Sequence, residues 1–204
     1  MRLYFTRHGE SEANIIREIS NRGFRHGLTD KGRQQAAALA ETMRGKGITR
    51  IYTSPLKRAV ETANIVSEAL GIPSQVTDAL REFDCGIVEG RGDREAWKQW
   101  QTVWVEWFER GNPGYRIPEG ESYTDIYNRF VPFVEGLVAE KGDTDESMIL
   151  IGHGGTYECM LKNVLTIPRL ADLPEPRFPN TGYVLAETRP EGLFCLEWCG
   201  VPTR

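Results

Sequence analysis

Leu3-Tyr4-Phe5-Thr6-Arg7-His8-Gly9-Glu10 joins a short apolar run to a group of residues that suit the binding of an anion. The apolar run predicts a strand over residues 2–6, which places His8 at the exit of that strand. There Gly9 lets the backbone approach a ligand closely, Arg7 offers a planar fork of donors, and imidazole is a nucleophile or base at neutral pH. The same residues also occur as an ordinary surface or capping pattern, so the remaining sequence must decide between these two interpretations.

Beyond this stretch, short β-rich runs alternate with helical patterns along the whole chain. This alternation is typical of a parallel sheet with helices packed on both faces. We therefore predict an α/β fold, a three-layer sandwich with a mostly parallel central sheet, as a single domain over residues 1–204. Further strands are expected at 49–53, 75–77, 148–151 and in a hairpin of 182–188 with 193–198, and helices at 29–43, 54–70 and 156–165.

Residues 93–141 differ from this pattern and are expected to form a small helical insertion over the edge of the sheet. Tryptophans recur at helical spacing in its first half, so that four of the five in the chain share one helix face. Either this face packs into the core, or one end of it forms a wall of a substrate pocket. The four residues are Trp97, Trp100, Trp104 and Trp107.

The overall charge argues against several classes of partner. The 204 residues include 25 basic and 29 acidic side chains, which give a net charge of -4. A nucleic-acid-binding or anionic membrane surface is therefore not expected, and any affinity for an anion must be local. The first apolar run is too short for a signal sequence, and no stretch approaches the roughly 20 apolar residues of a spanning helix. A soluble, cytoplasmic protein is expected.

The four cysteines predict buried free thiols. Cys85, Cys159, Cys195 and Cys199 form no Cys-x-x-Cys pair and have apolar neighbours, which favours thiols over a disulfide framework or a zinc site. The sequence also has no P-loop and no cluster of histidine and carboxylate residues at metal-ligand spacing. We therefore expect chemistry that needs no metal ion.

Charged and imidazole side chains follow three of the predicted strands. His8 follows the first strand, Arg58 lies one turn into the helix after the second, and His153 follows the strand 148–151 within a glycine-rich corner. Ligands of open α/β sheets bind beyond the carboxyl ends of the strands, so these residues are expected to converge. With Arg7 they would surround a dianionic, tetrahedral group, which predicts a pocket for a phosphoryl group.

Five short motifs are spread in order along the whole chain. They are Arg7-His8-Gly9-Glu10-Ser11 with Asn14, Leu28-Thr29 with Gly32, Thr53-Ser54-Pro55-Leu56 with Arg58, Glu82 in a Leu-x-Glu context, and Gly152-His153-Gly154. Together they resemble the histidine phosphatase superfamily, also called phosphoglycerate mutase-like. Each motif alone is weak, but five of them in this order and spacing are specific.

The resemblance implies a mechanism through a phosphohistidine, without a cofactor. His8 would attack the phosphorus atom of a small phosphorylated substrate in line. Glu82 would protonate the departing oxygen and then activate water for the second step. The resemblance implies that three other side chains would hold the transferring group: Arg7, Arg58 and His153. Asn14 would be a further phosphate or pocket contact.

The residues around Glu82 resemble the phosphatase branch of that superfamily more than its mutases. Mutases carry Glu-Arg-x-Tyr-Gly around the acid, whereas this chain has Arg81-Glu82-Phe83-Asp84-Cys85-Gly86 and is shorter than typical mutases. We therefore expect hydrolysis of a small phosphorylated metabolite. A mutase-type phosphoryl transferase and a non-catalytic phospho-ligand-binding module remain the alternatives, and both a monomer and a homodimer are compatible with the sequence.

A basic loop between the first strand and the first long helix has two interpretations. It carries Arg17, Arg22, Arg25 and His26 in a protein whose net charge is negative. It is either a solvated turn or a device that selects a second anionic group on the substrate.

Overall fold

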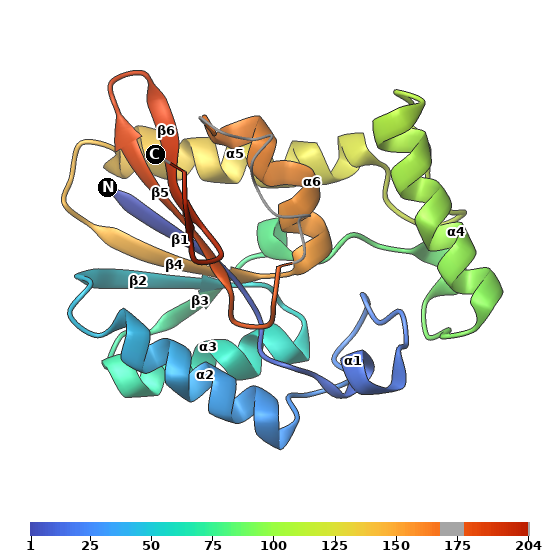
Figure 1. Cartoon of the computed structure of the whole chain (residues 1–204), viewed down its shortest axis with the longest axis horizontal. Coiled ribbons are helices and arrows are strands. Elements are labelled where there is room, and N and C mark those ends of the chain that lie inside the picture. The colour runs from blue at the N-terminus through green and yellow to red at the C-terminus, as the bar shows by residue number, and fades with distance from the viewer. Residues whose placement is uncertain (168–177, 204) are drawn as a thin grey trace.

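The computed structural model describes residues 1–167 and 178–203. Its strands are β1 (Arg2–Arg7), β2 (Ile48–Thr53), β3 (Ser74–Val76), β4 (Ser147–Gly152), β5 (Tyr183–Arg189), β6 (Gly192–Trp198) and β7 (Val201–Pro202). They form one sheet in the order β3-β2-β4-β1-β5-β6-β7 (Figure 1). The neighbours from β3 to β1 are parallel, and those from β1 to β7 are antiparallel. The predicted α/β fold class is confirmed.

The register of the central strands explains where functional side chains meet. Arg7 at the end of β1 lies opposite Gly152 at the end of β4, and Thr53 at the end of β2 lies opposite Ile151. β4 is buried along its whole length, as expected of a central strand. The segments that follow these three strands therefore leave the sheet side by side, at the carboxyl ends of the strands.

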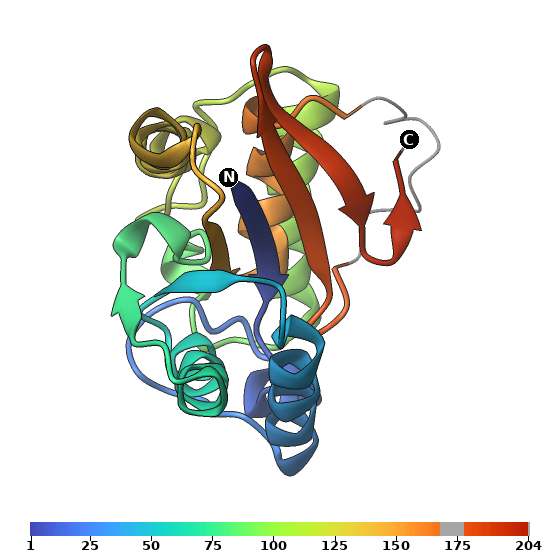
Figure 2. The same cartoon turned by 90° about the vertical axis from the view of Figure 1, so that its left-hand side faces the viewer.

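Helices cover both faces of the sheet. They are α1 (Glu12–Ile16), α2 (Asp30–Met43), α3 (Lys57–Leu70), α4 (Arg94–Trp104), α5 (Tyr123–Lys141) and α6 (Gly154–Val164), with 3-10 turns η1 (Asp78–Leu80) and η2 (Gly86–Val88) and a π-helical turn η3 (Val105–Glu109). α2 and α3 lie on one face, α5 and α6 on the other, and α4 stands to the side (Figure 1). Figure 2 shows the same separation from the side, with α5 and the pair α2 and α3 on opposite sides of the sheet.

The two faces of the sheet bury separate apolar clusters. Tyr4 and Ile149 pack with α2 and α3, whereas their neighbours Phe5 and Leu150 pack with α5 and α6. Successive residues of a strand point to opposite faces, so a continuous apolar run is what a strand covered on both sides requires. The sequence of β4 therefore reflects its central position.

The predicted position of α5 over the edge of the sheet is wrong. The ring of Phe130 lies 6.4 Å from that of Phe5 in β1, and the ring of Phe133 lies 5.4 Å from that of Tyr52 in β2. This helix therefore covers the face of the sheet. Its apolar pattern shows that it is amphipathic, but not which apolar surface it meets.

The start of α3 also differs from the prediction. The helix begins at Lys57, whereas the Ser54-Pro55 pair was expected to begin it. The hydroxyl of Ser54 accepts from the backbone N–H of Leu56 over 3.3 Å, and it also lies 2.7 Å from Nε2 of His153. Ser54 thus turns the chain and contacts the neighbouring strand end.

Two expectations about the whole chain can be compared with the structure. Within the described residues, no helix is both long and apolar enough to cross a membrane. All four cysteines are free thiols and three of them are buried, which confirms the prediction of free thiols.

Candidate active site

Two histidines face each other where β1 and β4 end. The ring centroids of His8 and His153 are 5.0 Å apart, and both side chains are buried. Each histidine directly follows its strand, and the two strands are adjacent, parallel and in register. The sheet therefore brings together two residues that are far apart in the sequence.

The hydrogen bonds of His8 determine which ring nitrogen carries the proton. Nδ1 lies 2.6 Å from the carbonyl oxygen of Gly9, which can only accept, so Nδ1 carries the hydrogen. The Nε–H of Arg58 donates to Nε2 over 3.0 Å, so Nε2 carries the lone pair that accepts this bond. Burial and the nearby guanidinium groups of Arg58 and Arg7 hold the pKa of His8 well below its usual value. His8 is thus a neutral imidazole with its lone pair on Nε2.

Arg58 is a buried cation in the first turn of α3. Its side chain is held at two points, since it donates from Nε to His8 and from Nη1 to the carbonyl oxygen of Ser20 over 2.7 Å. Burial lowers its pKa to about 10, although the charge of Glu82 opposes this shift. The guanidinium therefore remains charged at neutral pH, and its orientation is fixed before any ligand binds.

Beside His8, two further buried side-chain nitrogen atoms have no hydrogen-bond partner among the residues that the structure describes. They are Nε of Arg7 and Nδ1 of His153. The opposite ends of these side chains are anchored, because Arg7 donates from Nη1 to the carbonyl oxygen of Phe178 and His153 contacts the hydroxyl of Ser54. A buried polar group without a partner is unfavourable, so an oxygen-rich ligand would stabilise this arrangement.

Glu82 lies at the amino terminus of α6. One carboxylate oxygen accepts from the N–H of Gly155 over 3.0 Å, and the other accepts from the N–H and hydroxyl of Thr156 over 2.7 and 2.9 Å. The exposed N–H groups of a helix start favour an acidic side chain. A Cβ atom on Gly155 would lie 2.9 Å from Oε1 of Glu82, so a larger residue there would force the carboxylate to move.

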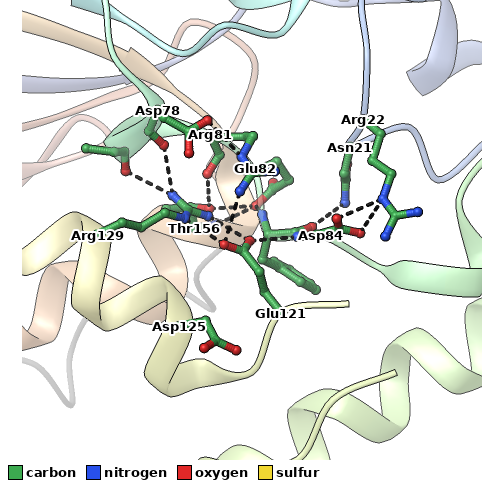
Figure 3. Close-up of polar contacts among 12 residues, drawn as sticks. Asn21, Arg22, Asp78, Arg81, Glu82, Asp84, Glu121, Asp125, Arg129 and Thr156 are labelled. Carbon is green, nitrogen blue, oxygen red and sulfur yellow. Dashed lines mark hydrogen bonds and ion pairs between the residues drawn. The ribbon is translucent and has the colours of Figure 1, made fainter. Parts of the chain in front are cut away.

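A second carboxylate, in the loop just before α5, holds the segment around Glu82 (Figure 3). Glu121 accepts from Nη2 of Arg81 over 3.2 Å, from Nε of Arg129 over 2.9 Å and from the N–H of Asp84 over 2.9 Å. Its two arginine partners keep only 24% and 14% of their side-chain surface exposed. This network positions the residues on either side of Glu82.

A cleft of about 270 Å³ opens beside these groups. Trp97 and Trp100 line it, whereas Trp107 is buried in the core, so both interpretations of the tryptophan face apply to different parts of it. His153 lies against His8 below the cleft surface. The other residues predicted from the sequence all line the cleft: Arg7, His8, Asn14, Arg58 and Glu82.

Residues 3–200 match the sequence model of a protein family, the histidine phosphatase superfamily (branch 1). The chain belongs to this superfamily. The resemblance seen in the sequence motifs is thereby confirmed.

This superfamily member is similar to two relatives, and the share of each relative's length that it covers differs. It is 33% identical over 172 residues to "Probable phosphoglycerate mutase GpmB" of Proteus mirabilis (strain HI4320), covering 84% of this chain and 78% of the relative. It is 35% identical over 164 residues to 6-phosphofructo-2-kinase/fructose-2,6-bisphosphatase of Gallus gallus, covering 78% of this chain and 32% of the relative. The chain thus spans about a third of the second protein.

Solved structures share the fold of this superfamily member over nearly its full length. Mycobacterial glucosyl-3-phosphoglycerate phosphatase superimposes with a TM-score of 0.80 at 24% identity, covering 97% of this chain and 98% of that chain. YhfR of Bacillus stearothermophilus superimposes with a TM-score of 0.78 at 26% identity, covering 98% and 96%.

Sequence reasoning gave no site role to three residues that support the site of this superfamily member. Ser54 contacts His153, Thr156 contacts Glu82, and Glu121 holds the flanking segment. Ser54 and Thr156 follow strand ends closely, which was a usable signal. Glu121 stands in a Pro118-x-Gly120-Glu121-Ser122 motif that resembles the family's pattern, but its role could not be predicted locally, because its partners come from other segments of the chain.

The basic loop is largely neutralised by acidic neighbours. Nε of Arg22 donates to both carboxylate oxygens of Asp84, over 2.8 and 2.7 Å. Arg25 and His26 both contact Oε1 of Glu18, at 3.0 and 2.9 Å. Three of the four basic side chains are therefore paired within the protein, and none of the four lines the cleft.

The buried histidines predict a loss of stability in mild acid. Burial, reinforced by the charge of Arg58, holds the pKa of His8 and of His153 well below the usual value. In the unfolded chain both take up a proton below about pH 6.5, so the unfolded state binds more protons there. The free energy of unfolding should fall as the pH drops from about 6.5, by up to roughly 1.4 kcal/mol per pH unit for each histidine.

Urea denaturation between pH 6.5 and 5.5 measures this loss, and His8→Gln provides the comparison. The variant keeps His153 alone as a buried histidine, so its loss of stability over this interval should be about half that of the unaltered protein. Equal losses in the two proteins would show that protonation of His8 does not contribute.

Proposed function

We propose that this chain is a metal-independent phosphomonoesterase that hydrolyses a small phosphorylated metabolite through a phosphohistidine at His8. The observation that carries the proposal is the pair of hydrogen bonds on the His8 ring. The carbonyl of Gly9 fixes the proton on Nδ1, and Arg58 fixes the lone pair on Nε2 at the base of the cleft. Once a phosphoryl oxygen takes over the Nε–H of Arg58, this lone pair is free to attack phosphorus, and a neutral imidazole needs no base to activate it.

In the first step, Nε2 of His8 forms a bond to phosphorus as the bond between phosphorus and the ester oxygen breaks. Arg7, Arg58 and His153 donate hydrogen bonds to the phosphoryl oxygens, where charge accumulates during transfer. The buried nitrogen atoms of Arg7 and His153 that have no partner within the described residues support this role. The departing oxygen takes a proton from the carboxyl group of Glu82 and leaves as an alcohol.

In the second step, water attacks the phosphorus atom of the phosphohistidine. The carboxylate of Glu82 accepts a proton from this water, the bond between Nε2 and phosphorus breaks, and inorganic phosphate leaves. Glu82 is then protonated again, and His8 regains its lone pair. Asn14, at the edge of the cleft, is proposed as a further phosphate or pocket contact.

The relatives support this reading of the site. The mycobacterial glucosyl-3-phosphoglycerate phosphatase has been solved with VO3 and with inorganic phosphate, and both are tetrahedral or phosphate-like oxyanions of the kind that this cluster of donors suits. Another structural relative is described as a putative α-ribazole-5'-P phosphatase of Escherichia coli. Phosphoryl groups are thus the shared ligand chemistry.

The proposal is tested with p-nitrophenyl phosphate in the presence of EDTA. We expect release of phosphate that is unaffected by the chelator, and a phosphoryl group on His8 after rapid denaturation in alkali, detected by peptide mass spectrometry. The modification should disappear in acid, because a phosphohistidine is acid-labile. Loss of turnover in EDTA, or phosphate on a different residue, would contradict the mechanism.

A mutase-type phosphoryl transferase is the second candidate, favoured by the 33% identity to the probable phosphoglycerate mutase. Such an enzyme returns the phosphoryl group to a hydroxyl of the substrate faster than to water. Incubation with 3-phosphoglycerate after priming with 2,3-bisphosphoglycerate distinguishes the two. Isomerisation without net release of phosphate would identify a mutase, and release of phosphate without isomerisation would identify a phosphatase.

Glu82→Gln should affect poor leaving groups much more than good ones. An alkyl alcohol must be protonated as it leaves, whereas p-nitrophenolate is stable as an anion. We expect kcat to fall roughly 100-fold or more for glycerol 3-phosphate and much less for p-nitrophenyl phosphate. Equal losses for both esters would assign Glu82 a structural role at the start of α6.

A further inference from the structure

The peptide group between Gly9 and Glu10 is held at both its oxygen and its nitrogen. Its carbonyl oxygen accepts the hydrogen of Nδ1 of His8 over 2.6 Å, and its N–H donates to Oε1 of Gln35 over 2.8 Å. A peptide group is planar and trans, so its N–H and its C=O point in opposite directions. The contact with Gln35 therefore fixes the direction of the carbonyl group that meets the His8 ring.

Gln35 reaches this peptide group because α2 packs directly against it. A Cβ atom on Gly9 would lie 2.5 Å from the carbonyl oxygen of Gly32, and one on Gly32 would overlap the carbonyl oxygen of Glu10. The two glycines thus let the two backbones touch. Gln35 follows Gly32 by three residues in the helix, so both lie on the face that meets this segment.

The preceding peptide group, between His8 and Gly9, is held without Gln35. Its N–H donates to the hydroxyl of Thr62 over 3.1 Å, and its carbonyl oxygen accepts from the side-chain amide of Asn180 over 3.0 Å. The backbone position of His8 therefore does not depend on residue 35. Loss of the Gln35 oxygen should release the second peptide group alone.

The direction of the Gly9 carbonyl matters for the proposed nucleophile. A hydrogen on Nδ1 of His8 leaves the lone pair on Nε2, which is the atom that attacks phosphorus. The same carbonyl stabilises the positive charge that the ring acquires as this bond forms. Donation from the peptide N–H to Gln35 polarises the peptide group and makes its carbonyl oxygen a stronger acceptor.

We propose that Gln35 is a positioning residue for the nucleophile: its side-chain oxygen orients the Gly9–Glu10 peptide group, whose carbonyl keeps the hydrogen on Nδ1 of His8. This inference rests on the proposed phosphohistidine mechanism and adds a residue to it. Gln35 is not among the described residues that line the cleft. It therefore acts on the reaction through the backbone and not through the substrate.

A purely structural anchor is the alternative role for Gln35. The start of α2 also holds Glu10 by other bonds, since the N–H of Thr29 donates to its carbonyl oxygen over 3.0 Å and Lys31 pairs with its carboxylate at 2.9 Å. These bonds anchor the segment but do not set the direction of the Gly9 carbonyl. The proton of the His8 ring therefore distinguishes the two roles.

The first measurement is ¹⁵N–¹H NMR of protein labelled at its histidines, with His8→Gln to assign the His8 signals. We expect His8 of the unaltered chain to be the Nδ1–H tautomer, with a low-field proton from its short hydrogen bond. Gln35→Met keeps the side-chain length but removes the oxygen, so it should move this proton to higher field or broaden it by exchange with water. Gln35→Glu restores an acceptor and should restore the signal.

The second measurement is the rate of the first turnover with p-nitrophenyl phosphate, followed as the initial release of p-nitrophenolate. Gln35→Met should lower this rate about tenfold, an amount that one hydrogen bond can supply, while the affinity for inorganic phosphate changes by less than about twofold. Gln35→Glu should recover most of the rate. Gln34→Met makes the same change in an exposed side chain one position earlier, and as the matched control it should leave the rate within about twofold and the His8 signal unchanged.

An Nε2–H tautomer of His8 in the unaltered chain would overturn this inference. So would an unchanged His8 spectrum or an unchanged first turnover in folded Gln35→Met. If that variant does not fold, Gln35→Asn gives the same comparison, because its oxygen is drawn back by one methylene. A chain that releases no p-nitrophenolate would contradict the proposed function, whereas the spectra would still decide whether Gln35 places the ring proton.

Discussion

His8→Ala is expected to lower kcat/KM for p-nitrophenyl phosphate by roughly 10,000-fold or more. Alanine cannot form the bond to phosphorus, while the guanidinium groups that would bind the phosphoryl group remain in place. The affinity for inorganic phosphate, measured by isothermal titration calorimetry, should therefore change far less than the rate. The phosphohistidine should be absent from the variant.

The third histidine provides the matched control. His26 has a left-handed backbone with a φ of 50°, and asparagine tolerates this conformation. His26→Asn should therefore retain the fold and nearly all of the activity. If His8→Ala kept most of its activity with a normal thermal unfolding profile, His8 would not be the nucleophile.

Arg58→Lys is expected to lower kcat/KM by roughly 1,000-fold, although the positive charge is retained. The Arg58 guanidinium donates at the same time to Nε2 of His8 and to the carbonyl oxygen of Ser20. A lysine ammonium group has three N–H donors but lacks this planar fork, so it cannot keep both contacts in place while it binds two phosphoryl oxygens side by side. The loss should appear in kcat as well as in KM.

A conservative change elsewhere calibrates this effect. Arg44 lies just beyond α2 with 54% of its side chain exposed, and its ion pair is with Glu41. Arg44→Lys should leave the kinetic constants unchanged within about twofold, because exposed ion pairs contribute little. A similar, small effect of Arg58→Lys would show that only the charge of Arg58 matters.

Much of the site can be predicted from short stretches of sequence. His8 and His153 stand in glycine-rich corners directly after strands, and Arg58 lies one turn into a helix after another strand. Such patterns depend on neighbouring residues, so they are visible without a structure. The rule that ligands bind beyond the carboxyl ends of parallel strands then predicts that they meet.

Other features depend on which elements become neighbours. The location of α5 over the face of the sheet follows from contacts such as Phe130 with Phe5, which are far apart in the sequence. The neutralisation of Arg22 by Asp84 has the same origin. The periodicity of a segment indicates that it has an apolar or a charged side, but it does not identify the partner of that side.

The sequence by itself determined the α/β class, the order of the elements, and the choice of Arg7, His8, Arg58 and His153 as candidates, because strand periodicity and corner motifs are local. The choice of Glu82 rested on the family resemblance. Only the tertiary structure decided how these residues are paired. The lone pair on Nε2 of His8 is directed by Arg58, and Glu82 is held at the start of α6. His8 and Arg58 meet because the parallel strands β1, β4 and β2 end level with one another, so that groups distant in the chain come within hydrogen-bond distance.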